Sequence, residues 1–158
     1  MTFELTPTGP AEPTRPANPG ESTQTLLDRL GGHDAVVRLV DAFYDRIEGD
    51  EELRAIFPQD LSAGREKQML FMEQWFGGDA VYSQRYGHPR LRRRHFPFIV
   101  SDRGAGRWLR HMTEALRECG AADDVVAEML SALGPLAHQM VNEGQAVPRD
   151  PLEDSFLS

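Results

Sequence analysis

The sequence predicts an all-α fold, and three observations support this prediction. Between about residues 22 and 145, apolar residues recur at intervals of three and four, as expected of helices buried on one face. No stretch alternates polar and apolar residues with the period of two that a half-buried strand shows. Glycine pairs and prolines stand where the helical pattern stops, as at residues 31–32, 58 and 77–78.

The first part of this helical body predicts three helices. The segment TQTLLDRL, residues 23–30, forms a short helix that the glycine pair at 31–32 ends. A second helix spans about residues 34–48 and turns Tyr44 inward or nearly so, beside an apolar face made of Val36, Val40, Phe43 and Ile47. EELRAIFP then predicts one or two helical turns. These turns end before Pro58, because the residue before a proline avoids helical geometry.

The second part predicts three longer helices. Ser62 is placed to cap a helix that ends at the glycine pair 77–78, and Gln68 is a polar residue on its otherwise apolar face. A long helix opens at Ser101 or Asp102, with Trp108 facing the core. The last helix begins near residue 123, and Pro135 bends it by deleting a hydrogen bond.

Composition divides the chain into three parts. Residues 1–21 form a Pro-rich extension, residues 22–145 a helical domain, and residues 146–158 a carboxyl-terminal tail. Five prolines in the extension stand three residues apart, which is the period of a polyproline II helix. A docking motif is one interpretation, but we expect a disordered extension, because it has too little apolar surface to bury.

Several classes of protein are excluded by composition. No apolar run approaches the roughly 20 residues of a membrane-spanning helix, and the amino-terminal residues lack the basic and apolar regions of a signal peptide. The single cysteine, Cys119, forms no intrachain disulfide, which fits a reducing compartment. We therefore expect a cytoplasmic protein without membrane contact. A net charge of −8 argues against general nucleic-acid binding.

One basic cluster stands out in this acidic chain. The stretch HPRLRRRHFPF, residues 88–98, places four arginines around His95. Three interpretations of this cluster are a solvated surface, a nucleic-acid contact and an anion site. We favour the anion site because the whole-chain charge opposes nucleic acid.

His95 is a candidate metal ligand. It lies between Pro89 and Pro97, so any helix there is little more than one turn and holds the imidazole at a defined point. The neighbouring arginines oppose its protonation, and neutral imidazole is the form that binds metal. No CxxC or HxxxH pair exists to complete a metal site. An isolated histidine is also common at surface and core positions, so spacing alone leaves both interpretations open.

A haem would account for both the arginine cluster and the isolated His95. Its porphyrin supplies four nitrogens, its iron needs one axial imidazole, and its two propionates suit an arginine cluster. Tyr44, Gln68 and Trp108 would then be hydrogen-bond donors toward a ligand on the iron. Buried tyrosine and tryptophan are also ordinary core residues, whereas buried glutamine is uncommon.

From Leu26 to Asn142 the body resembles the group II truncated haemoglobins. The stretches that carry the resemblance are FYDRI at 43–47, IFP at 56–58, FMEQWFGG at 71–78, YSQRYGHPRLRRRHFPF at 82–98 and WLRHM at 108–112. The resemblance implies a two-over-two helical sandwich around one haem b, with His95 as the proximal ligand to iron. It also implies that the distal donors are Tyr44, Gln68 and Trp108.

The same resemblance implies the rest of the pocket. Phe57 matches an aromatic residue that wedges against the porphyrin, where some relatives carry a second tyrosine. Gly64 matches the usual distal gate, so no bulky gate blocks ligand entry. The complete expected haem pocket is Phe57, Gly64, Met72, Phe98 and Met112, and the expected propionate contacts are Tyr82, Arg92 and Arg94.

The resemblance implies binding of O₂, NO and CO at the iron. Strong distal donors imply slow release of O₂, which favours NO dioxygenation or peroxidase-like handling of H₂O₂, with an unidentified reductase, over oxygen transport. One alternative is a haem-based gas or redox sensor, or an O₂ storage or delivery module, acting through a partner. Another is a haem-free helical module that binds nucleic acid through RLRRR, residues 90–94, with steep salt dependence.

Overall fold

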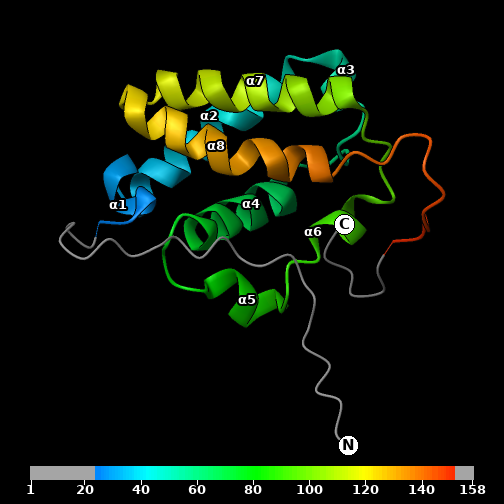
Figure 1. Ribbon diagram of the computed structural model, residues 1–158, viewed down its shortest axis with the longest axis horizontal. Helices are drawn as coiled ribbons and strands as arrows, with labels where there is room; N and C mark the ends of the chain where they lie inside the picture. Colours follow the sequence, from blue (N-terminus) through cyan, green and yellow to red (C-terminus); the bar gives the residue numbers. More distant parts are fainter. Residues whose placement is uncertain (1–23, 152–158) are drawn as a thin grey trace, which may run out of the picture.

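The computed structural model describes residues 24–151, and every regular element in that range is an α-helix (Figure 1). In chain order the helices are α1 (Leu26–Leu30), α2 (His33–Glu48), α3 (Glu51–Arg54), α4 (Ser62–Trp75), α5 (Val81–Tyr86), α6 (Leu91–His95), α7 (Asp102–Glu118) and α8 (Asp123–Gln139). The all-α prediction is confirmed for this part of the chain.

Local sequence explains several helix ends. Thr25 caps α1, since its hydroxyl accepts from the Asp28 amide while the Asp28 carboxylate accepts from the Thr25 amide. Gly31 ends α1 with a φ of 122°, a conformation that disfavours any residue with a side chain. Ser101 caps α7 through the Gly104 amide, at 3.0 Å. The predicted boundaries of α2 and the predicted start of α7 are confirmed to within one residue, whereas α1 begins three residues later than predicted.

Two local predictions need correction. Ser62 is the first residue of α4 and not its cap: the Asp60 carboxylate accepts from the Ser62 amide at 2.9 Å and from its hydroxyl at 2.7 Å. Leu61 is the N-cap residue, and the carboxylate two residues before Ser62 accepts from the first amide of the helix. Helix α5 is not among the predicted helices, because six residues are too few to show a helical period.

The long helices pack as two pairs around one core. Helices α2 and α4 form one pair, α7 and α8 form the other, and α2 also packs against α7. In Figure 1 the short helices α5 and α6 lie on the α4 side of this arrangement. The fully buried residues between the pairs include Val36, Leu39, Phe43, Met112, Ala115, Leu116 and Met129. The core therefore fixes the long helices, whereas α6 lies beside them.

The domain division stays a prediction. The proposed extension, residues 1–21, lies outside the described residues, as do residues 152–158 of the proposed tail. In the described part of that tail, Arg149 donates hydrogen bonds to the Phe96 carbonyl and to the Asn142 side chain. None of the helices within residues 24–151 is long and apolar enough to cross a membrane.

Candidate functional site

A largely apolar cavity lies among α4, α6, α7, α8 and the segment from α2 through α3 to α4. Its apolar walls come from Leu53, Ile56, Phe57, Phe71, Met72, Leu91, Phe98, Val100, Leu133, Leu136 and Met140. A smaller number of polar side chains reach the same cavity, namely Tyr44, Gln68, Trp108, His95, Lys67, Tyr82, Arg94 and Asp60. Apolar walls with a few convergent polar groups are typical of a cofactor site.

His95 presents a neutral imidazole at this cavity. It is the last residue of α6, and its Nδ1 lies 2.7 Å from the Leu91 carbonyl oxygen. A carbonyl only accepts hydrogen bonds, so Nδ1 carries the proton and Nε2 keeps its lone pair. Burial lowers the pKa of His95 below its ordinary 6.5, partly opposed by the bond to Leu91. At neutral pH the ring is therefore competent as a metal ligand.

The cause of this neutrality differs from the one expected. The sequence suggested that the arginines repel a proton from His95, whereas burial is the main cause of the lowered pKa. The guanidinium groups of Arg92 and Arg93 lie over the Phe96 ring, 4.9 and 5.8 Å from its centroid. Stacking on this ring occupies the two groups. The direction of the prediction holds, but its mechanism was wrong.

Three potential hydrogen-bond donors reach the cavity from three different long helices. Tyr44 comes from α2, Gln68 from α4 and Trp108 from α7. Phe43 packs edge-on against two of them, with ring centroids 5.6 Å from Tyr44 and 5.2 Å from Trp108. Because Phe43 is completely buried, these contacts hold both rings in place.

Tyr44 keeps its proton over a wide pH range. Burial raises the pKa of Tyr44 to about 12, and the Arg65 guanidinium, 5.3 Å from the ring centroid, partly opposes this shift. Within residues 24–151, Gln68 makes one long side-chain contact, 3.9 Å from its Nε2 to the Met72 sulfur. Among the described residues, neither the Tyr44 hydroxyl nor the Trp108 indole forms a hydrogen bond. All three side chains can therefore donate to a bound ligand.

Gly64 lies directly against Tyr44. A Cβ atom at this position would lie 3.3 Å from the Tyr44 hydroxyl, which is tighter than most real contacts. The missing side chain thus lets α4 approach Tyr44 closely. Phe57 completes this corner, with its ring edge-on to Tyr44 at 6.1 Å.

Most of the other predicted pocket residues also reach the cavity. Phe57, Gly64, Met72 and Phe98 line it, and so do the expected propionate contacts Tyr82 and Arg94. Met112 does not, because it is completely buried in the core between the helix pairs. Arg92 does not either: it is exposed and donates to the Gln145 side chain. The structure thus separates two predicted residues from the rest.

Lys67 was missed by the sequence reasoning. It lines the cavity, and its ammonium lies 5.7 Å from the centroid of the Tyr86 ring. No sequence signal pointed to it, because adjacent residues of a helix do not share a face and a long side chain has many rotamers. Together with Arg94 and Tyr82 it places two cations and a phenol at the cavity.

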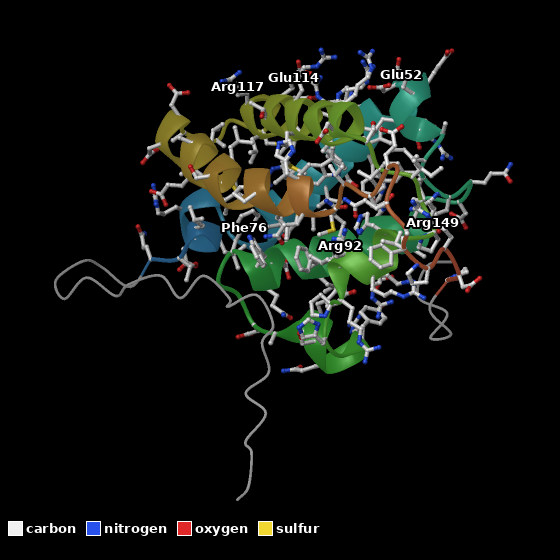
Figure 2. All side chains as sticks on the ribbon, turned by 45° about the vertical axis from the view of Figure 1, so that its right-hand side comes forward. Glu52, Phe76, Arg92, Glu114, Arg117 and Arg149 are labelled. Atoms are coloured by element: carbon white, nitrogen blue, oxygen red, sulfur yellow. The ribbon has the colours of Figure 1, made fainter. Side chains whose placement is uncertain are left out.

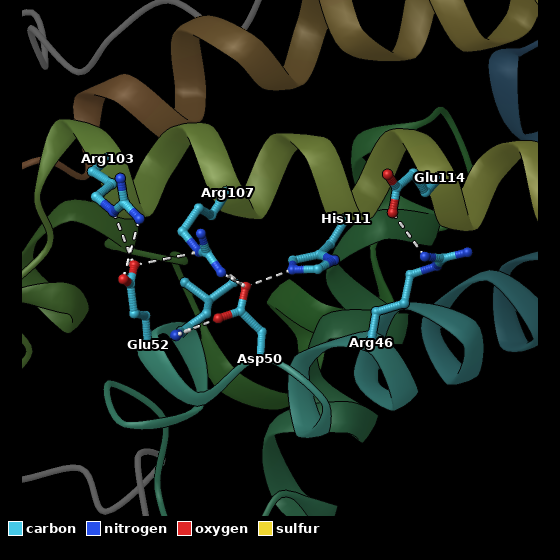
Figure 3. Close-up of polar contacts among 8 residues, drawn as sticks. Arg46, Asp50, Glu52, Arg103, Arg107, His111 and Glu114 are labelled. Carbon is cyan, nitrogen blue, oxygen red and sulfur yellow. Dashed lines mark hydrogen bonds and ion pairs between the residues drawn. The ribbon is translucent and has the colours of Figure 1, made fainter.

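A buried ionic network on α7 was also missed (Figure 3). The Asp50 carboxylate accepts from Arg107, at 2.8 Å, from His111 Nε2, at 2.7 Å, and from the Leu53 amide, at 3.2 Å. These hydrogen bonds, led by that of Arg107, hold the pKa of Asp50 well below its usual range. The network ties the α3 corner, near Phe57, to the helix that carries Trp108.

The arrangement suits a haem. Among the described residues, no three His, Cys, Asp or Glu side chains form a group able to hold a metal ion. A metal at His95 would therefore need its other ligands from a cofactor, as a porphyrin provides. The apolar walls suit the macrocycle, and Arg94 and Lys67 suit its carboxylates. The fold and site thus define a globin-type haem pocket.

Comparison with known proteins supports this class. A sequence profile of the bacterial-like globin family matches residues 25–142. The group 2 truncated haemoglobin YjbI of Bacillus subtilis is 36% identical over 130 residues, covering 82% of this chain and 98% of the relative. The group II truncated haemoglobin of Bacillus anthracis superimposes with a TM-score of 0.75 at 32% identity, covering 85% of this chain and 98% of that one.

A third similarity is to a truncated, oxygen-avid haemoglobin from Bacillus subtilis. Its crystal structure superimposes with a TM-score of 0.72 at 34% identity and covers 75% of this chain and all of that one. The present chain therefore belongs to the bacterial-like globin family, as a group II truncated haemoglobin with the two-over-two fold. Globins bind haem and small gas ligands, so membership implies both for this protein.

Proposed function

We propose that this protein holds haem b through His95 Nε2 and binds O₂ tightly for redox or detoxification chemistry rather than transport. When bound, the haem supplies an iron site for O₂, NO, CO or H₂O₂. The observation that carries the proposal is the meeting of Tyr44, Gln68 and Trp108, from three helices, at the cavity that His95 lines.

The distal side chains would act by donating hydrogen bonds. Tyr44 remains protonated because its pKa is about 12, and the Trp108 indole can only donate. Hydrogen bonds toward a group carrying partial negative charge contribute about 1.5–3 kcal/mol each. Donors held by buried packing need no reorganisation when the ligand arrives. They would slow the release of O₂, as befits a relative described as oxygen-avid.

Slow release argues against oxygen delivery. A carrier must give up its ligand, whereas conversion of NO to nitrate, or peroxidase-like use of H₂O₂, benefits from a held and polarised ligand. Both reactions need an electron donor, and we assign that role to an unidentified reductase. A cytoplasmic location, with its supply of reductants, fits this role.

We assign the propionate contacts to Arg94, Tyr82 and Lys67. Arg94 and Tyr82 are buried, with 5% and 4% of their surfaces exposed, and all three side chains line the cavity. The Arg94 Nε also donates to the Pro89 carbonyl at 2.8 Å, which holds the guanidinium in place. Arg92 lies outside the cavity and is not included.

Absorption spectra test the haem assignment. Haem-reconstituted wild type is expected to show a strong Soret band and, after reduction, a CO complex. His95→Gly should lose or alter both, whereas His88→Gly, at an exposed loop position, should match the wild type. Failure of the wild type to take up haem, or unchanged spectra in His95→Gly, would refute the proximal assignment.

A second experiment tests the choice of reaction. The oxygenated protein is mixed with one equivalent of NO, and nitrate is measured. Near-stoichiometric nitrate supports NO dioxygenation, and peroxide-dependent oxidation of a phenol supports the peroxidase-like reaction. If neither occurs, a sensor or storage module is favoured. Deleting residues 1–20 then asks whether a partner is lost while ligand affinity stays unchanged.

A further inference from the structure

Two residues at the carboxyl-terminal side of the domain contact the segment that carries His95. Asn142 follows α8 and is completely buried. Arg149 lies seven residues further on, beyond the span that the family profile matches. Figure 2 shows Arg149 on the side of the molecule where Arg92 of α6 also lies. Neither Asn142 nor Arg149 lines the cavity.

Asn142 hydrogen-bonds to the backbone of residues 95–100. Its Nδ2 donates to the carbonyl of His95 at 3.2 Å and to that of Phe98 at 3.0 Å. Its Oδ1 accepts from the Val100 amide at 3.2 Å, and its own backbone amide donates to the Val100 carbonyl at 2.9 Å. One buried side chain thus spans the whole turn between α6 and α7.

Arg149 contacts both Asn142 and the turn that Asn142 holds. Its Nη1 donates to the Phe96 carbonyl at 3.0 Å and to Asn142 Oδ1 at 2.7 Å, and its Nη2 donates to the Asn142 carbonyl at 2.9 Å. Among the residues the structure describes, the guanidinium of Arg149 has no carboxylate partner. Its rigid fork is therefore used on carbonyl oxygens, which need a fixed direction of approach.

These contacts constrain His95 at its backbone. The Leu91 carbonyl sets the rotation of the imidazole through Nδ1, at 2.7 Å, while Asn142 holds the His95 carbonyl. Helix α6 has only five residues, too few to be stable without contacts to the rest of the domain. Phe98 and Val100, held by the same side chain, line the cavity.

We propose that Asn142 and Arg149 are positioning residues for His95: they clamp the turn from residue 95 to residue 100 and thereby fix the distance and tilt of the imidazole in the cavity. This proposal rests on the proposed role of His95 as the iron ligand. It assigns a role in the haem site to a residue outside the matched domain.

The test uses full-length haem-loaded protein and three variants. Arg149→Gln removes the fork, Asn142→Asp removes the donors to the His95 and Phe98 carbonyls while keeping the acceptor, and Arg110→Gln changes an exposed α7 arginine as control. The iron–histidine stretching band of the reduced, unligated protein is measured by resonance Raman spectroscopy. We expect the band to shift or broaden in the first two variants and to match wild type in the control.

Haem loss gives a second readout. Outer residues that orient a metal ligand typically change metal affinity by 10–100-fold, so transfer of haem to an acceptor protein should be about tenfold faster in Arg149→Gln. Amide hydrogen exchange at residues 96–101 should also be faster than in Arg110→Gln. If one variant does not fold, the other supplies the band and the exchange rates.

The outcomes separate this proposal from the one it rests on. If His95→Gly abolishes the band while Arg149→Gln and Asn142→Asp keep it at the wild-type position and width, His95 is the ligand and the clamp is refuted. If His95→Gly leaves the band unchanged, the proximal assignment itself is wrong, and the clamp falls with it.

Discussion

The two sides of the candidate haem pocket are built differently. On the distal side, Tyr44, Gln68 and Trp108 project from long helices that the core already holds, and Phe43 packs against two of their rings. On the proximal side, His95 stands on a five-residue helix, and hydrogen bonds from Asn142 hold its backbone. Apolar packing positions the rings of Tyr44 and Trp108, whereas hydrogen bonds to the turn that follows α6 position His95.

This difference predicts how each side responds to mutation. A distal polar atom can be removed while the ring that carries it still fills its place, so ligand binding should change with little loss of stability. The proximal turn is joined to the end of the domain by hydrogen bonds from Asn142 and Arg149, and loss of such a contact should move the imidazole. The Asp50 network is a third case, in which charges join two elements directly.

Removing the Asp50 carboxylate should have the largest effect on stability. Asp50→Ala leaves the Nε2 of the buried His111 without its acceptor and removes the nearer carboxylate partner of Arg107, whose other partner, Glu52, lies 3.5 Å away. Breaking a buried pair in this way costs about 3 kcal/mol. Urea unfolding of the haem-loaded protein measures this loss, with Asp79→Ala at an exposed position as control. A loss no larger than in the control would mean that the network does not join α3 to α7.

Tyr44→Phe should separate function from folding on the distal side. It removes one donor but keeps the ring contacts with Phe43 and Phe57, so the O₂ dissociation rate should rise about 30-fold, corresponding to about 2 kcal/mol. Stopped-flow displacement of O₂ by CO measures the rate. The control is Tyr86→Phe, since Tyr86 does not line the cavity. An unchanged rate would show that Tyr44 does not donate a hydrogen bond to the bound ligand.

Lowering the pH should reduce the contribution of Asp50 to the stability of the folded protein. The pKa of Asp50 is lowered in the folded protein, so its contribution is fully present above the unfolded value of 3.8 and is lost as the pH falls toward the folded value. Stability should fall by up to about 1.4 kcal/mol per pH unit in this range for this group. Asp50→Asn should have a flatter acid limb in unfolding curves measured from pH 5 to 2.5. Equal slopes would contradict this assignment.

Trp108→Phe should have the smallest of these effects. The indole N–H is lost while an aromatic ring still packs near Phe43, and a neutral donor contributes about 1 kcal/mol. The O₂ dissociation rate should therefore rise about fivefold, less than in Tyr44→Phe. Combining the two changes tests whether both donors act on one ligand, because effects that are not additive in free energy would show coupling.

Much of this protein could be predicted from local sequence. The apolar period placed α2, α7 and α8, and the same period turned Tyr44, Gln68 and Trp108 toward the interior, where the structure brings them to one cavity. Gly31 and Ser101 marked helix ends because caps depend on residues within one turn. Such features need no knowledge of how the helices cross.

Other features depended on tertiary structure alone. Asp50 meets Arg107 and His111 across 57 and 61 residues of chain, and Asn142 meets the His95 carbonyl across 47. No periodicity reports contacts between distant residues, since they follow from where helices pack. Long polar side chains have many rotamers, so their sequence position did not show that Lys67 reaches the cavity while Arg92 stays outside. The sequence pattern determined the long helices and the faces they bury, and helix packing decided which polar groups meet.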